Sequence, residues 1–151
     1  MLVHLGIDST DSLTKGMCTT YVGMILAKRL LSQGAHFVDY PNLIRLNPTI
    51  PYKTRGNGAV ALRIEIPENR IGEVFATARE TVEEFAVFSD PQTNPGIALY
   101  AGDVPDTLHT FYEQALHRLL EIEDAYSTAE EVGARLHGYK NKRGVIGALA
   151  S

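Results

Sequence analysis

The sequence predicts an α/β fold in which a mixed β-sheet is flanked by α-helices. Three observations support this class: short apolar runs of strand length, longer segments with apolar side chains at helical spacing, and intervening loops rich in Gly, Pro, Asn and Asp. Strands and helices mix without strict β-α-β regularity, which favours a two-layer or three-layer arrangement. A length of 151 residues fits one domain, residues 1–151.

The first half of the chain alternates strands with one helix. Leu2–Ile7 is short and apolar and stops at an aspartate, which predicts a buried strand. Residues 19–33 have apolar side chains at helical spacing, and Gly34 follows as a predicted C-cap. Asn42–Leu46 is strand-like, and Gly58–Ile66 alternates between apolar and other side chains, so both are predicted strands.

The second half is richer in helices. Glu68–Phe85 and Asp106–Leu120 each place their large apolar side chains on one face, which predicts amphipathic helices. Gly96–Tyr100 is a predicted strand between them. Ser127–Leu136 is predicted as a further helix, because a Ser-Thr pair precedes two glutamates as at many helix starts. Val145–Ala150 begins another apolar element.

Composition narrows the class of protein. The net charge of −4 differs from that of most chains whose main task is to grip a nucleic-acid backbone. A single cysteine excludes an internal disulfide and fits a reducing cytoplasm. We see no signal peptide and no apolar run near the ~20 residues that cross a membrane. Arg143–Ser151 looks like the start of a packed element, so we expect the chain to be the N-terminal part of a longer, multidomain protein.

Two carboxylates follow the first predicted strand. Asp8 and Asp11 lie three residues apart, so they can converge on one hard cation. Mg²⁺ commonly takes one or two protein carboxylates and completes its shell with water and phosphate oxygens. The alternative is that both aspartates form turns or cap the next helix, as they do in many loops.

A phosphate cradle is predicted at the start of the first helix. Gly16 is followed by Cys18, Thr19 and Thr20, which offer backbone N–H groups and hydroxyls at a helix N-terminus. The spacing is not that of a Walker A loop. The alternative is an N-cap by Thr19 or Thr20, which needs no ligand. Thr19 can also accept a phosphoryl group beside two metal-binding aspartates, whereas Cys18 fits a small buried residue better than a nucleophile.

The loop Asn47–Asn57 is the most unusual stretch of the sequence. Long loops of this kind often carry function. Two prolines stiffen it, Gly56 permits close approach, and Lys53 and Arg55 supply cations suited to a polyphosphate. The alternative is a rigid surface loop with solvated charges.

Two further loops carry weaker signals. His137–Gly144 is basic and can touch ATP or an RNA phosphate, although solvated basic loops are commoner. Its cations are Lys140, Lys142 and Arg143. Thr93–Gly96 is interpreted as a tight turn at the start of a strand.

Taken together, several segments resemble one known family. These are Gly6–Thr20, Leu43–Val60, and Thr93–Gly96 with Arg143–Ala150. They resemble the archaeal synthetases that join agmatine to the wobble cytidine of the minor isoleucine tRNA, the 2-agmatinylcytidine synthetases. The middle segment is long and odd in composition, and the resemblance spans nearly the whole chain.

The resemblance implies a kinase-like, ATP-binding domain of unusual fold that requires Mg²⁺. It implies phosphorylation of the C2 oxygen of the cytidine, after which the amine of agmatine displaces the phosphate. It also implies that tRNA is gripped mainly by a ferredoxin-like domain, an OB-fold and a zinc ribbon, which 151 residues with one cysteine do not contain.

The family's pattern assigns roles to individual residues. Asp8 and Asp11 match its acidic metal-binding pattern, and Thr19 matches the threonine, directly after the cysteine, that takes up phosphate. Ser9 stands where the pattern usually has a second acidic residue. Three residues match the loop motif and are assigned to ATP phosphates by charge: Lys53, Arg55 and Asn57. The residues expected to carry the reaction are Thr19, Asp11, Lys53 and Arg55.

Two other functions remain compatible with the residues. A non-catalytic RNA-binding or regulatory module would keep the fold and lose the chemistry, in line with Ser9 and the absent domains. A nucleotidyl-transferring or phosphate-hydrolysing enzyme acting on a small substrate is a further alternative. The products formed from ATP would separate these cases.

Overall fold

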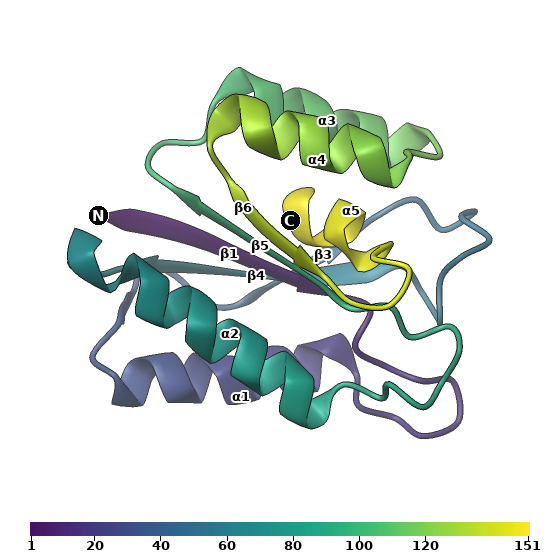
Figure 1. The fold of residues 1–151 in the computed structure, drawn as a ribbon, viewed down its shortest axis with the longest axis horizontal. Helices are drawn as coiled ribbons and strands as arrows, with labels where there is room; N and C mark the ends of the chain where they lie inside the picture. The colour runs from purple at the N-terminus through teal and green to yellow at the C-terminus, as the bar shows by residue number, and fades with distance from the viewer.

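The computed structural model describes all of residues 1–151, and its β-sheet lies between two layers of helices. Helices α1 and α2 cover one face of the sheet, and α3, α4 and α5 lie over the other (Figure 1). The predicted α/β class, with helices flanking a sheet, is confirmed in its three-layer form. None of the helices combines the length and the apolar character needed to span a membrane.

The elements follow the predicted order closely. In chain order they are β1 (Leu2–Asp8), α1 (Thr19–Ser32), β2 (His36–Phe37), β3 (Asn42–Arg45), β4 (Gly58–Glu65), a 3₁₀ turn (Glu68–Arg70), α2 (Ile71–Phe85), β5 (Gly96–Ala101), α3 (Asp106–His117), α4 (Ile122–Val132), β6 (Arg135–Gly138) and α5 (Gly144–Leu149). Gly34 follows the end of α1 with φ +85°, as expected of a residue just beyond a helix C-terminus.

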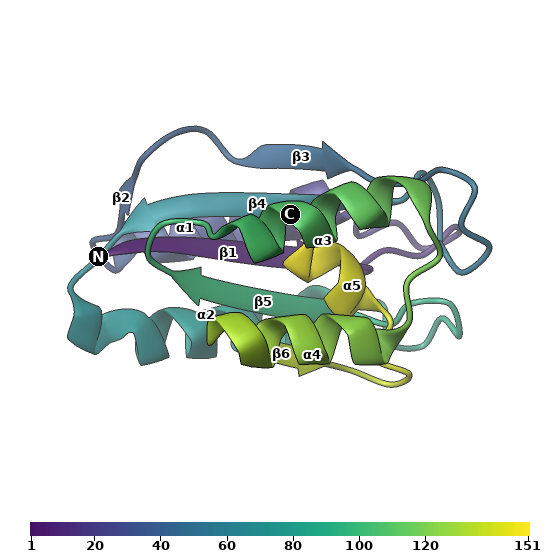
Figure 2. The same ribbon diagram turned by 90° about the horizontal axis from the view of Figure 1, so that it is seen from above.

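The sheet has the strand order β2-β4-β1-β5-β6, and β3 also pairs with β4. Every strand pair is antiparallel, where the sequence predicted a mixed sheet. Strand β1 is central: Ile7 lies opposite Val60 of β4 on one side and opposite Ile97 of β5 on the other. Figure 2 shows β2 and β3 following one another along the edge beside β4. Strand directions could not be derived from the sequence, because pairing depends on contacts between distant segments, which local patterns do not record.

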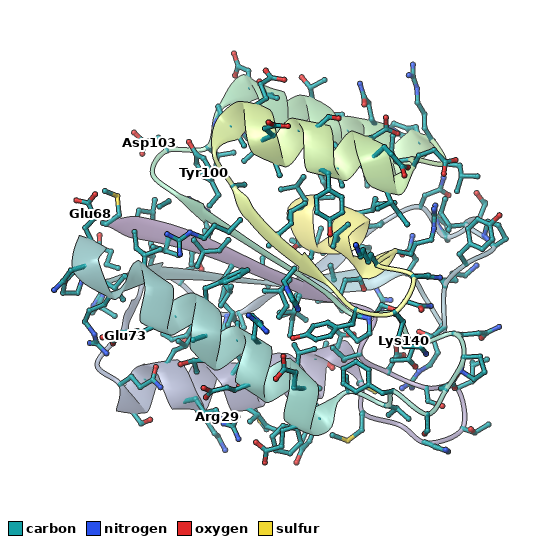
Figure 3. All side chains as sticks on the ribbon, viewed as in Figure 1. Arg29, Glu68, Glu73, Tyr100, Asp103 and Lys140 are labelled. Carbon is teal, nitrogen blue, oxygen red and sulfur yellow. The ribbon has the colours of Figure 1, made fainter.

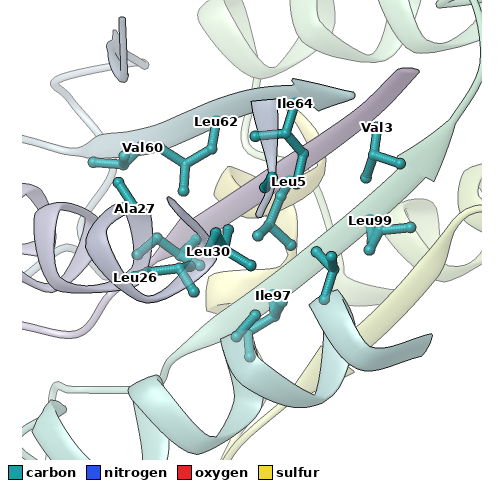
Figure 4. Close-up of a cluster of buried hydrophobic side chains, with 14 of the residues drawn as sticks. Val3, Leu5, Leu26, Ala27, Leu30, Val60, Leu62, Ile64, Ile97 and Leu99 are labelled. Carbon is teal, nitrogen blue, oxygen red and sulfur yellow. The ribbon is translucent and has the colours of Figure 1, made fainter. Parts of the chain in front are cut away.

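One face of the sheet carries the large aliphatic side chains. Alternate residues of β1, β4 and β5 point toward α1 and α2 and form a core with the buried face of α1 (Figure 4). The strand members of this cluster are Val3, Leu5, Ile7, Val60, Leu62, Ile64, Ile97 and Leu99. This packing fixes the position of α1 on the sheet, and therefore the position of its N-terminus.

The opposite face of the sheet carries small residues beneath α5. A Cβ atom added to Gly6 would lie 2.0 Å from the carbonyl oxygen of Ala148, and one added to Gly96 would lie 2.1 Å from the carbonyl carbon of Gly144. The backbone of α5 therefore rests directly on the backbone of β1 and β5, an approach that only glycine permits.

The helix predicted at Ser127–Leu136 is wrong in its bounds. Helix α4 begins five residues earlier, at Ile122, and the backbone N–H of Glu121 donates to Asp124 at 2.8 Å. Ile122 begins the apolar side of α4 that packs into the core formed with α3 and α5, and this packing outweighs the capping signal at Ser127. Gly133 ends the helix with φ +75°, and the following residues form β6.

Candidate phosphate and metal site

A cavity of about 410 Å³ lies where β1 ends and α1 begins, and the loop 47–57 and the start of α5 also line it. Its volume falls within the usual range for small-molecule sites. The structure brings eight of the predicted site residues to this cavity: Asp8, Asp11, Cys18, Thr19, Thr20, Lys53, Arg55 and Asn57.

Gly16 is the predicted site residue that does not line the cavity. It has φ +79° and pairs with Ser12 in a short bridge, which closes the loop between β1 and α1. Its place in the structure is that of a turn residue that brings the chain back toward Cys18.

Asp8 is the last residue of β1, and its carboxyl group is enclosed. Although the residue keeps some exposed surface, its Oδ2 lies so close to α5 that a Cβ on Gly147 would be 1.9 Å away. The backbone N–H of Ser9 donates to Oδ1 at 2.6 Å. The pKa of Asp8 is raised from 3.8 to about 7, mainly by burial; the Ser9 hydrogen bond opposes the shift, and the charge of nearby Asp11 adds to it.

This shift predicts how stability changes with pH. The folded chain keeps a proton on Asp8 that the unfolded chain has already released between about pH 4 and pH 7, so the free energy of unfolding should fall as pH rises through this window. The change should amount to a few kcal/mol at most, and Asp8→Asn should flatten it, as measured by urea unfolding at a series of pH values. An unchanged slope in Asp8→Asn would contradict the assignment.

Asp11 is held by the loop 47–57. Its Oδ1 accepts a hydrogen bond from Thr54 Oγ1 at 2.5 Å, and its Oδ2 accepts one from Arg55 Nε at 2.8 Å. A terminal nitrogen of Arg55 also contacts Cys18 Sγ at 3.1 Å. The hydrogen bond to Asp11 raises the pKa of Arg55 above its usual value. Arg55 thus links the aspartate loop to the start of α1.

The first turn of α1 opens into the cavity. Its N-cap residue is Cys18, which makes no side-chain capping bond, so the predicted cap by Thr19 or Thr20 is not formed. The backbone N–H groups of Thr19 and Thr20 therefore have no partner within the helix. Thr19 is buried, and its Oγ1 accepts from Thr10 Oγ1 at 3.2 Å. Cys18 is half-exposed, whereas the sequence favoured a buried residue.

The loop 47–57 is closed at its base by Asn57. Its side-chain amide donates to the carbonyl oxygen of Asn47 at 2.6 Å, and its own carbonyl accepts from the N–H of Leu46 at 2.9 Å. Lys53 Nζ donates to the carbonyl oxygen of Ile50 at 3.0 Å and makes no ion pair. Lys53 therefore remains free to attract an anion.

Several cavity residues were not singled out from the sequence. Arg45 ends β3, Arg118 follows α3, and neither side chain makes an ion pair within the chain. Each is an ordinary charged residue in its own segment, so no local signal marks it. With Lys53, Arg55 and Arg143 they give the cavity a cationic lining in a chain whose net charge is −4.

The basic loop after β6 divides into two parts. Arg143 lines the cavity and lies over the ring of Tyr52, 4.6 Å from its centroid. Lys140, labelled in Figure 3, instead donates to the carbonyl oxygen of Asp90 at 2.6 Å, in the loop between α2 and β5. Of the three cations in this loop, only Arg143 reaches the cavity.

The segment 93–96 leads into β5, but the predicted tight turn lies earlier, at residues 91–92. The segment also supports the aspartate loop. Thr93 Oγ1 donates to the carbonyl oxygen of Asp11 at 2.6 Å, and the N–H of Asn94 donates to Ser9 Oγ at 3.1 Å. Ser9 has φ +59°, a conformation that small polar residues tolerate better than bulky ones. This segment therefore helps to fix the positions of Asp8 and Asp11.

The donor set fits a magnesium ion better than a protein-only metal centre. No cluster of three or more His, Cys, Asp or Glu side chains exists that could hold a metal ion alone. The carboxylates that line the cavity are those of Asp8 and Asp11. Mg²⁺ is commonly bound through one or two carboxylates together with the phosphates of a substrate. Oδ2 of Asp8 lies against Gly147 of α5, whereas Oδ1 accepts the hydrogen bond from Ser9.

The fold and the cavity define this chain as a three-layer α/β domain with a cationic pocket beside two carboxylates. Residues 4–74 match the family model of the TiaS TCKD domain. The chain is 48% identical over 151 residues to TiaS of Pyrococcus horikoshii, a 2-agmatinylcytidine synthetase of an isoleucine tRNA, and 46% identical over 149 residues to TiaS of Thermococcus sibiricus. In sequence and in fold, the whole chain therefore resembles one part of the TiaS proteins.

Solved structures of the family agree with this placement. The chain superimposes with a TM-score of 0.92 and 39% identity on TiaS in a complex with its isoleucine tRNA and ATP, and with a TM-score of 0.89 and 36% identity on TiaS in a complex with the same tRNA, AMPCPP and agmatine. Each match covers 99% of this chain and 35% of the other. The chain thus spans about a third of the length of the relatives it matches.

Proposed function

We propose that this chain is the ATP- and Mg²⁺-dependent catalytic domain of a tRNA-modifying synthetase, which phosphorylates the wobble cytidine of an isoleucine tRNA and then attaches agmatine. One observation carries the proposal. A single cavity combines the open first turn of α1, two carboxylates and five basic side chains. Phosphoryl transfer depends mainly on positioning and charge neutralisation, and this combination supplies both.

Each group in the cavity has a proposed task. Asp8 and Asp11 would hold Mg²⁺, which when bound neutralises charge on the phosphates. The N–H groups of Thr19 and Thr20 would bind phosphate oxygens at the positive end of the α1 dipole. Lys53 and Arg55 would stabilise the polyphosphate, and the Thr19 hydroxyl would take up or orient the transferred phosphate.

The partners follow from the family. Relatives are known in complexes with an isoleucine tRNA, ATP or its analogue, and agmatine. Because this chain spans about a third of their length, we propose that regions corresponding to the remainder provide most of the grip on tRNA. A tRNA substrate and a single cysteine favour the cytoplasm as its location.

Calorimetric titration of the chain with ATP and Mg²⁺ tests the proposal. We expect saturable binding in the micromolar to millimolar range typical of enzyme substrates, weakened at least tenfold in Asp11→Ala. Lys28→Ala is a matched control, because Lys28 is exposed on α1 and does not line the cavity. Absence of binding by the unmodified chain, or equal binding in Asp11→Ala, would overturn the proposal.

The products formed from ATP separate this function from its alternatives. With tRNA and agmatine present, the proposed phosphorylation of the cytidine releases ADP, and the later displacement by agmatine releases phosphate. Release of AMP and pyrophosphate would instead indicate nucleotidyl transfer. A purely RNA-binding module would release neither, and its affinity for tRNA would survive Asp8→Ala.

A further inference from the structure

Arg55 lies between the residue proposed to bind the cation, Asp11, and the helix turn proposed to bind the phosphates. Its Nε binds Oδ2 of Asp11 at 2.8 Å, and a terminal nitrogen reaches Cys18 Sγ at the start of α1. The guanidinium therefore bridges the carboxylate proposed for the cation and the helix turn proposed for the phosphates. Its side chain is 39% exposed, whereas the side chain of Asp11 is only 12% exposed, so Arg55 is the partner with more room to move.

Both oxygens of the Asp11 carboxylate accept a hydrogen bond. Thr54 donates to one oxygen and Arg55 to the other, and both donors come from the loop 47–57. A guanidinium bound to a carboxylate cancels most of its attraction for a cation. A divalent cation that approaches Asp11 must therefore compete with Arg55.

A polyphosphate offers Arg55 a different partner. Guanidinium groups bind phosphate oxygens in the same forked geometry with which they bind carboxylates. The unpaired N–H groups of Thr19 and Thr20 would draw phosphate to the end of α1, within reach of the arm of Arg55 that now touches Cys18. The exchange would release Oδ2 of Asp11 at the moment when the phosphates arrive.

We propose that Arg55 is an exchange residue, which closes Asp11 to divalent cations in the free protein and moves to phosphate when nucleotide binds. This inference rests on the proposed function, since it assumes that cation and nucleotide share the cavity. One consequence is that the nucleotide-free protein binds divalent cations weakly. A second is that bound nucleotide raises the affinity for the cation by the same factor by which bound cation raises the affinity for the nucleotide.

Removing Arg55 should change the two affinities in opposite directions. In Arg55→Ala, the affinity of the nucleotide-free protein for Mn²⁺ should rise about tenfold, because the competing guanidinium is gone, while the affinity for Mg²⁺–ATP should fall about tenfold or more. Mn²⁺ prefers the same oxygen ligands as Mg²⁺, and free Mn²⁺ is counted directly by electron paramagnetic resonance.

Two comparisons keep the test decisive. Arg118→Ala removes a cavity arginine that does not touch Asp11, so it should weaken Mg²⁺–ATP binding but change Mn²⁺ affinity by no more than about twofold, the effect of a more distant charge. Arg55→Gln keeps a hydrogen-bonding side chain without the charge and should behave as Arg55→Ala if folding is intact. Circular dichroism melting confirms folding of each variant.

The outcomes separate the exchange from simpler roles and from the proposed function itself. If Arg55 only bound phosphate, Mn²⁺ affinity would stay unchanged in Arg55→Ala; if Arg55 only supported the loop, both affinities would fall. Either result would overturn the exchange while leaving Mg²⁺–ATP binding by the unmodified chain intact. Failure of the unmodified chain to bind Mg²⁺–ATP would instead refute the proposed function.

Discussion

Gly144→Ala is expected to lower the free energy of unfolding by about 3 kcal/mol, near the upper end of the usual cost of overpacking. The added Cβ would meet only backbone atoms: the carbonyl oxygen of Asn94 at 2.4 Å, the nitrogen of Gly96 at 2.5 Å and the carbonyl carbon of Pro95 at 2.8 Å. These atoms cannot rotate away as a side chain does. Relief would require α5 to lift from β5 and would break the 2.9 Å hydrogen bond from Gly144 to Asn94.

Guanidinium unfolding measures this change, and Gly72→Ala provides the control. Gly72 lies in helix α2 at an exposed position, and a Cβ there meets nothing within 4 Å. Alanine at this position should raise stability by roughly 0.5–1 kcal/mol, because glycine is a poor helix former. A Gly144→Ala protein as stable as the unmodified chain would show that α5 can shift along the sheet.

Gly147→Ala is expected to weaken Mg²⁺–ATP binding about a hundredfold, a loss of roughly 2.7 kcal/mol, with a smaller effect on folding than Gly144→Ala. Its Cβ would lie 1.9 Å from Oδ2 and 2.7 Å from Cγ of Asp8. These atoms belong to a side chain, which can rotate away from α5. The rotation would relieve the clash but carry the carboxylate out of the position from which it is proposed to hold the cation.

A double-mutant cycle checks that the effect passes through Asp8. In an Asp8→Ala background the clashing oxygens and Cγ are absent, so Gly147→Ala should then cost much less stability than it does in the unmodified chain. Calorimetry gives the binding change, and urea unfolding gives the coupling energy. Equal stability costs in both backgrounds would assign the loss to another contact of α5.

Much of the fold was predictable because the strands and long helices carry periodic patterns. Strands at 2–8, 58–65 and 96–101 agree with the predictions to within a residue or two, and α1 and α2 agree nearly as well. The errors arose where two signals competed. At Ser127 a capping pattern suggested a helix start, but the apolar side of α4 that begins at Ile122 gained more by packing against α3 and α5.

The candidate site was predicted unevenly for a physical reason. Asp8 ends β1 at the start of a loop, and Asp11 and Arg55 lie in loops of unusual composition, so their residue types alone suggested chemistry. Arg45 and Arg118 reach the same cavity from separate elements, and only the packing of α3 above the sheet brings them together. Thr54, which holds Asp11, resembles any other loop threonine until the fold places it.

The central position of β1 also has a consequence for how the chain reaches its native state. Leu2 pairs with Glu65 and Val3 pairs with Ala101, so the middle strand of the sheet finds its neighbours only among residues far along the chain. Such distant pairings slow folding, because the entropy cost of closing a long loop comes before the stabilising contacts form. During synthesis, β1 would wait with its apolar residues uncovered until β5 has emerged, and this interval is when a molecular chaperone would protect the chain most.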